Sequence, residues 1–199
     1  MNNGQFEDEA PSLDIAPGRF IIAAPGNEYG FLQRSVQLIF HCDFNSDFNS
    51  DEQVAYTVVL GRMTDIPLQG MIDAWAPLAG KPHAFFHGGM SNRKAVIALA
   101  TGSSLTDPLE RCPSVGVLQL SGDPASLMGT IGQARFFMGI NSVPFSTLKE
   151  GIAKGHFRLM DARPDLIFAP RTTDVWRECM RALPGTAPLW STFTPYGEN

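Results

Sequence analysis

Two arginines and a pair of glycines have the chemistry to bind a small anion. Arg34, followed by Ser35, and Arg62 each carry a guanidinium, and Gly88-Gly89 offers two backbone N–H groups that no side chain shields. Guanidinium and backbone N–H donors together suit a carboxylate or a phosphate. Alternatively, each arginine holds a loop through backbone carbonyls, and the glycines permit positive φ angles. The first alternative predicts a ligand-binding site formed by Arg34, Ser35, Arg62, Gly88 and Gly89.

Three histidines and a cysteine have side chains that could ligate a metal. His83 and His87 share one face of a predicted strand, but four residues along a strand span about 13 Å. Zinc ligands lie only about 2.1 Å from the ion, so this pair is too far apart. His41 and Cys42 are neighbours on a strand and therefore point to opposite faces. We predict neither a metal site nor a cofactor.

The three cysteines, Cys42, Cys112 and Cys179, are widely spaced and form no C-x-x-C pair. An odd number of such residues is typical of free thiols in a reducing cytoplasm. Cys42 is a candidate nucleophile with a nearby histidine as base, but a lone cysteine of this kind is more often an inert small apolar residue. Cys112 lies in a predicted loop and is expected to be more exposed, whereas Cys179 is expected in the core. No catalytic residue is predicted.

Residues 43–50 repeat Asp-Phe-Asn-Ser and resemble half of a calcium-binding loop. Such a loop needs glycine at its sixth position and glutamate at its twelfth, where this chain has Phe48 and Val54. We therefore interpret the segment as an expanded, solvated hairpin loop. Its aromatic side chains, Phe44 and Phe48, either fold back on the domain or dock on a partner, such as a second copy of this chain in a weak homodimer.

Net charge limits the partners that this chain can bind. It carries −5 at pH 7, and its 15 lysines and arginines are scattered along the sequence, unlike those of general polyanion binders. Neither a G-x-x-x-x-G-K-[ST] nor a G-x-G-x-x-G nucleotide motif occurs. An acidic amino-terminal segment and the lack of an apolar run of about 18 residues predict a cytoplasmic protein. We expect neither a nucleic acid nor a membrane as partner.

Strand and helix patterns are interspersed without a strict β-α-β rhythm, which favours an α+β fold over a doubly wound sheet. Apolar runs predict strands at residues 20–24, 36–40, 54–60, 83–87, 94–100, 116–120, 135–138 and 166–168. Helical spacing predicts helices at residues 67–75, 124–131, 144–154 and 173–183. We expect an acidic tail over residues 1–17, one domain over 18–185 and a C-terminal extension over 186–199.

The first predicted helix has the clearest start chemistry. Thr64 or Asp65 can cap it, and Pro67 suits its first turn. Its apolar face comprises Leu68, Met71, Ile72 and Trp75. The last predicted helix has a cap near Thr172 or Thr173 and buries Trp176, Cys179, Met180 and Leu183.

Several short segments, in order along the chain, resemble the AlgH/YqgE-like bacterial family. They are Gly18–Pro25 with Arg34-Ser35-Val36, then Leu60–Met63, Trp75–Ala79, Phe86–Met90, and Asp165–Phe168 with Trp176-Arg177. Together they cover most of the chain. The resemblance implies an α+β single domain with a bifurcated mixed sheet, a small barrel-like part and surrounding helices. The family has no settled biochemistry, so the resemblance implies no activity.

The chain departs from the family pattern at polar positions. The family's Gly-Gln-Leu-Glu segment is similar to residues 146–149 here, but its carboxylate is replaced by Lys149. Gly61 and Met63 replace the Asn and Pro of the family's Asn-Arg-Pro turn, and Cys42 stands where the family has a histidine. These replacements favour a non-catalytic binding or regulatory module for a small ligand or a protein partner. The alternatives are an enzyme acting on a small anion near Arg34 and, least favoured, a DNA-binding regulator.

Overall fold

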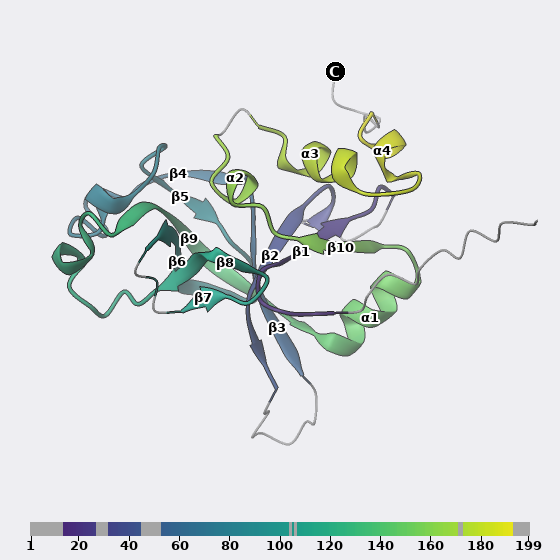
Figure 1. Ribbon diagram of the computed structural model, residues 1–199, viewed down its shortest axis with the longest axis horizontal. Coiled ribbons are helices and arrows are strands. Elements are labelled where there is room, and N and C mark those ends of the chain that lie inside the picture. The colour runs from purple at the N-terminus through teal and green to yellow at the C-terminus, as the bar shows by residue number, and fades with distance from the viewer. Residues whose placement is uncertain are drawn as a thin grey trace, which may run out of the picture.

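The structure is a computed structural model, and it describes residues 14–26, 32–44, 53–103, 105, 107–170 and 173–192. Its main element is one large, mostly antiparallel sheet, with few helices beside it (Figure 1). The expected single α+β domain is therefore confirmed. Residues 45–52, which include most of the Asp-Phe-Asn-Ser repeat, lie outside the described residues.

The strands follow one path, in the order β10-β1-β2-β3-β9-β6-β8-β7, with β4 and β5 as a branch. Their bounds are β1 Arg19–Ala23, β2 Val36–Asp43, β3 Val54–Val59, β4 Met63–Pro67, β5 Ala84–His87, β6 Asn92–Gly102, β7 Pro108–Leu109, β8 Cys112–Leu118, β9 Ile131–Pro144 and β10 Phe157–Asp161. Among the strand pairs of the described residues, β5 with β9 is the parallel one, and an isolated bridge between Ala79 and Ala134 is also parallel. This makes the sheet mixed, as expected.

The sheet forks along the long strand β9. Its last residues, 141–144, pair with β3, whereas Phe137 and Met138 pair with β5. The chain crosses this fork at Gly88, whose N–H donates to the carbonyl of Met138 (2.8 Å) and whose carbonyl accepts from the N–H of Val59 (2.7 Å). The branch formed by β4 and β5 therefore leaves the sheet where β3 ends.

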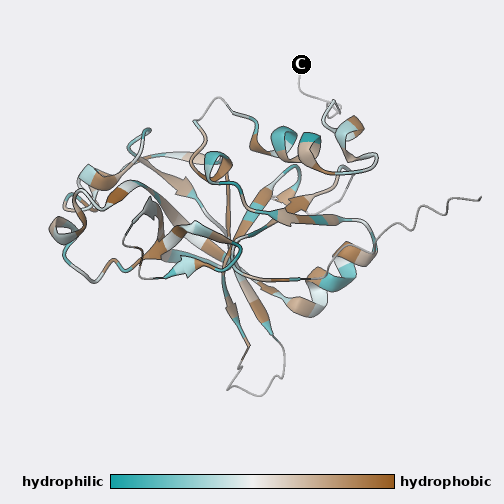
Figure 2. Cartoon of the chain, in the orientation of Figure 1, coloured by the Kyte–Doolittle hydropathy of each residue, from teal (hydrophilic) through white to brown (hydrophobic). Residues whose placement is uncertain are grey.

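Helices on both faces of the sheet explain why β1 is a continuous apolar run. In β1, Phe20 and Ile22 belong to the main core with α3, while Ile21 and Ala23 face α1 on the other side. Because both faces of β1 are covered, four successive positions, residues 20–23, are apolar instead of every second one. Figure 2 shows apolar segments concentrated in the strands. The helices are α1 Phe145–Ala153, α2 Pro164–Ile167, α3 Val175–Ala182 and α4 Ala187–Trp190.

The predicted helix over residues 67–75 is wrong. Met63–Pro67 is strand β4, and turns lead from Leu68 to a short 3-10 helix, Ala76–Leu78. Gly70 has φ +84°, a left-handed angle that an α-helix does not contain. Leu68 is buried but Met71 is 61% exposed, so the supposed apolar face is not one face.

The predicted helix over residues 124–131 is also wrong. A 3-10 helix spans Pro124–Leu127 and ends where Met128 becomes extended, and Gly129 then takes φ +84°. Ile131 begins β9. Met128, placed on the apolar face by the sequence pattern, is 57% exposed.

The predicted strand over residues 166–168 is wrong, because Leu166 and Ile167 end helix α2, Phe168 caps it and Pro164 lies in its first turn. Three apolar residues are too few to separate a strand from a helical turn, and proline at the start of a helix is the stronger signal. The two longer helices are confirmed. Their apolar faces are buried, but the cap of α3 is Asp174, whose side chain accepts a hydrogen bond from the N–H of Arg177 (3.0 Å).

Candidate functional site

Arg34 joins the loop before β2 to helix α3. Its guanidinium forms an ion pair with Asp174 (3.2 Å) and lies 4.8 Å from the ring centre of Trp176. Trp176 in turn donates its indole N–H to the carbonyl of Ala23 in β1 (2.7 Å). Arg34 has φ +46°, which is uncommon for a residue with a side chain. These contacts give Arg34 a structural role at this junction.

Arg62 and Ser35 both donate hydrogen bonds to backbone carbonyls of the loop before β2. Arg62 donates to the carbonyl of Gln33 (3.3 Å), and the buried hydroxyl of Ser35 donates to the carbonyl of Leu32 (2.6 Å). Burial lowers the pKa of Arg62. This contact with a backbone carbonyl is the one expected if Arg62 holds a loop in place. An anion site that uses Arg34 and Arg62 together stays a prediction.

Gly88 and Gly89 allow the backbone of β9 to approach closely. A Cβ on Gly88 would overlap the carbonyl oxygen of Gly139, and one on Gly89 would overlap the carbonyl carbon of Ile140. The N–H of Gly88 is already bonded to β9. The pair is therefore required by the fork of the sheet, and Gly89 also borders the cavity described next.

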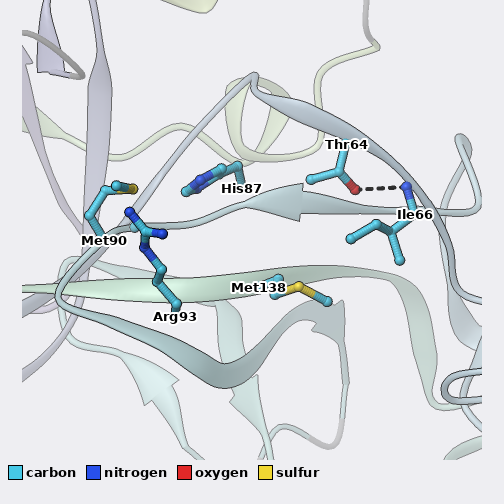
Figure 3. A pocket seen from close by; sticks show the side chains of 7 residues that line it. Thr64, Ile66, His87, Met90, Arg93 and Met138 are labelled. Atoms are coloured by element: carbon cyan, nitrogen blue, oxygen red, sulfur yellow. Dashed lines mark hydrogen bonds between the residues drawn. The ribbon is translucent and has the colours of Figure 1, made fainter.

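A cavity of about 310 Å³ lies beside the fork, between β4, β5, β6 and β9. It is lined by Thr64, Ile66, His87, Gly89, Met90, Arg93 and Met138 (Figure 3). In Figure 3, the His87 ring and the Arg93 guanidinium extend toward the same space as the Met90 side chain. The sequence predicts Gly89 as part of a ligand site and offers His87 only as a metal ligand. It gives no signal that Met90, Arg93 and Met138 border a common cavity.

A buried polar network holds one wall of this cavity. Asn141 accepts a hydrogen bond from the N–H of Met90 (2.8 Å) and donates to the side-chain oxygen of Gln37 (3.0 Å). The hydroxyl of Thr57 donates to the same oxygen (2.8 Å). Because all three polar residues are buried in the sheet, satisfied hydrogen bonds here specify one arrangement. The network fixes Met90 at the edge of the cavity.

Thr64 closes another wall. Its hydroxyl donates to the carbonyl of Phe85 (2.8 Å) and accepts from the N–H of Ile66 (3.2 Å), as the dashed line in Figure 3 shows for the second bond. The N–H of His87 donates to the carbonyl of Arg62 (2.7 Å). Strands β4 and β5 are thus tied together where they border the cavity.

A second cavity of about 360 Å³ lies nearer the outer end of the branch. It is lined by Pro67, Gln69, Asp73, Ala76, Pro77 and His83. The carboxylate of Asp73 accepts a hydrogen bond from the N–H of Gly70 (2.7 Å). His83, exposed at its rim, is separated from His87 by the length of β5. Within the described part of the chain, no group of three or more His, Cys, Asp or Glu residues is placed to hold a metal.

The cysteines are poor nucleophiles. Burial, with a smaller effect of Glu110, raises the pKa of Cys42 to about 12, and burial also raises the pKa of Cys179 to about 12. The expected exposure of Cys112 is wrong, because it begins strand β8 and is buried, which raises its pKa too. A thiol attacks as its thiolate, so these environments suppress the reaction proposed for Cys42.

We therefore expect all three thiols of the native protein to resist modification. At pH 7, a chromogenic disulfide reagent should react with fewer than one thiol per chain over minutes, and with all three after unfolding in guanidinium chloride. The native and unfolded samples differ only in burial, so the unfolded sample is the control. Rapid release of one equivalent from the native protein would contradict the burial of these thiols.

Phe44 folds back on the domain, as one of the two sequence alternatives expected. Its ring lies edge-on to Phe145 of α1, with ring centres 5.9 Å apart, although the side chain stays 57% exposed. Phe48 lies outside the described residues.

Comparisons with known proteins agree on one family. The AlgH-like family (DUF179) matches residues 20–188. A UPF0301 protein of Corynebacterium glutamicum is 27% identical over 90% of this chain and 94% of its own length. A UPF0301 protein of Streptomyces coelicolor is 24% identical over 88% of this chain and 91% of its own length.

Solved structures show the same fold. The crystal structure of a protein from Corynebacterium diphtheriae has a TM-score of 0.78 at 27% identity and covers 90% of this chain and 93% of its own. The solution structure of the AlgH protein from Pseudomonas aeruginosa has a TM-score of 0.58 at 15% identity, covering 90% and 95%. Among the described residues, no helix has the length and apolar character needed to cross a bilayer.

Proposed function

The chain belongs to the AlgH-like family, whose function is uncharacterised, and we propose that it is a non-catalytic protein that binds a small molecule in the cavity beside the sheet fork. The observation that carries this proposal is the cavity itself, because backbone and buried side chains hold its walls in place. Its volume of about 310 Å³ is near the lower end of ordinary small-molecule sites, about 300–1,000 Å³.

The lining supports binding more than catalysis. Among the described residues that border the cavity, only His87 and Arg93 carry ionisable side chains, and no carboxylate or thiol borders it. A hydrolytic or transfer reaction needs a nucleophile or an activated water beside its general base. The apolar side chains of Ile66, Met90 and Met138 provide contact area for a ligand.

A thermal-shift screen of small metabolites tests the proposal with a blocked variant. Met90→Trp places a larger side chain at the edge of the cavity, where Met90 is 41% exposed. At ten times its dissociation constant, a ligand stabilises the folded state by about 1.4 kcal/mol, which raises the Tm of a domain of this size by about 4 °C. We expect this shift in the wild type and its loss in Met90→Trp.

Met128→Trp is the matched control, because Met128 is also exposed but does not border the cavity. It should keep the shift seen in the wild type. The proposal fails if the compounds that stabilise the wild type stabilise Met90→Trp equally, or if a broad metabolite screen finds no stabilising compound.

A further inference from the structure

Arg93 differs from the other arginines of this structure. Arg34 and Arg62 bond to neighbouring residues, and Arg135 donates to two carbonyls. Arg93 makes no hydrogen bond or ion pair with any described residue, although it borders the cavity. Its guanidinium therefore has its hydrogen-bond donors free for a ligand.

The local fold aims Arg93 at the cavity. In the pairing of β6 with β9, Asn92 lies opposite Ile140 and Val96 lies opposite Met138. The segment from Asn92 to Val96 advances four residues along β6, whereas its partner segment on β9 advances only two. Arg93 lies in this irregular part of the pairing. Such bulges change the direction in which a side chain points. Figure 3 shows the Arg93 guanidinium rising from β6 to the side of the cavity where Met90 and His87 lie.

Apart from Arg93 and His87, no described residue of the lining carries an ionisable side chain. Ile66 and the thioether side chains of Met90 and Met138 form the apolar part, as Figure 3 shows. Thioethers are flexible and polarisable and pack well against varied apolar groups. Within the described lining no acidic side chain competes for Arg93 or would attract a cation. A ligand that matches this site is anionic at one end and apolar at the other.

Volume limits the size of such a ligand. The cavity of about 310 Å³ is near the lower end of ordinary small-molecule sites, about 300–1,000 Å³. The size therefore favours a short organic acid.

From these observations we propose that the cavity binds a small amphipathic organic anion, with its charged group on Arg93 and its apolar body against Met90 and Met138. This inference rests on the function proposed above and names the ligand class. The thioether pair alone is also soft enough to suit a monovalent metal, but the adjacent guanidinium charge opposes a cation. The anion is the occupant that the charges favour.

Hexanoate and hexanamide test the charge requirement, because they have similar size and shape and differ in charge. We would measure both dissociation constants by ligand-observed NMR, with inorganic phosphate as a third probe. Hexanoate should bind the wild type up to about fivefold more tightly than hexanamide, since a charge pair at an exposed arginine is worth at most about that factor. Added salt should reduce this preference.

Arg93→Gln should remove the preference for hexanoate and leave hexanamide binding unchanged. Lys94→Gln is the matched control, because it removes the same charge from the adjacent exposed position, which does not border the cavity. It should retain the preference. Thermal unfolding of both variants checks that each is folded.

Other binding results would overturn different parts of this inference. Equal binding of hexanoate and hexanamide to the wild type, or an unchanged preference in Arg93→Gln, overturns the anionic class while small-molecule binding stands. Phosphate binding as tight as hexanoate overturns the apolar half of the inference. Failure of all three probes to bind overturns the ligand class, whereas the proposed function is judged separately by the metabolite screen and Met90→Trp.

Discussion

Arg135→Met should be among the most destabilising single substitutions in this chain. The Arg135 side chain is 5% exposed, and its guanidinium donates to the carbonyls of Ile167 (2.7 Å) and Ala169 (2.8 Å). It also lies 4.2 Å from the ring centre of Phe86. Burial lowers the pKa of Arg135 to about 10, so the group remains charged at neutral pH and its hydrogen bonds are charge-assisted.

Methionine keeps much of the apolar stem but leaves two carbonyls of the α2 segment without their donors. Hydrogen bonds to a charged group are each worth about 1.5–3 kcal/mol, and an unsatisfied buried carbonyl adds a desolvation cost. We expect Arg135→Met to lower the free energy of unfolding by about 3 kcal/mol or more, measured by urea titration.

Arg181→Met is the control for removing an arginine. Arg181 is exposed in α3 and pairs with Glu178, and exposed pairs of this kind contribute about 0–1 kcal/mol. If Arg135→Met costs no more than Arg181→Met, then Arg135 does not hold α2 against the sheet.

Gly88→Ala should have a comparably large effect for a steric reason. The new Cβ would overlap the carbonyl oxygen of Gly139 and lie 3.0 Å from the Cβ of Phe137 and 3.2 Å from a methyl of Val58. All three neighbours are backbone or fully buried core groups, so β9 or the fork must move. Overpacking of this kind costs about 1–3 kcal/mol and occasionally more, and we expect the upper end.

Gly122→Ala is the matched control, because its Cβ would meet only the carbonyl oxygen of Gln119 at an ordinary 3.5 Å. Urea titration of the two variants, together with the soluble fraction after expression, gives the comparison. A soluble Gly88→Ala protein as stable as Gly122→Ala would contradict the close approach of strands at the fork.

Much of the central sheet could be predicted from the sequence because its strands are buried on both faces. Apart from Gln37, residues 36–40 and 54–59 are apolar, aromatic or β-branched, and they form part of β2 and all of β3. The wrong helices share one cause: apolar residues three and four apart also occur in turns. Gly70 and Gly129 adopt left-handed angles, which spacing alone does not reveal.

The candidate site was only partly predictable, because it depends on contacts between distant strands. The glycine pair at residues 88–89 stands out in the sequence, but its close packing against β9 follows from strand pairing. Arg93 lies in the polar run 91–94 and has the sequence pattern of any solvated cation. Its place beside Met138 follows from the register of β6 on β9, which no local pattern encodes.

The central claim is that the cavity beside the fork binds a small molecule, and methyl NMR tests it most directly. With ¹³C-labelled methionine methyl groups, the signals of Met90 and Met138 can be assigned by Met→Leu substitution and followed while a stabilising compound is added. Both should shift together and saturate with one dissociation constant, while buried Met180 of α3 stays unchanged. Stabilising compounds that leave both cavity signals in place would contradict the claim.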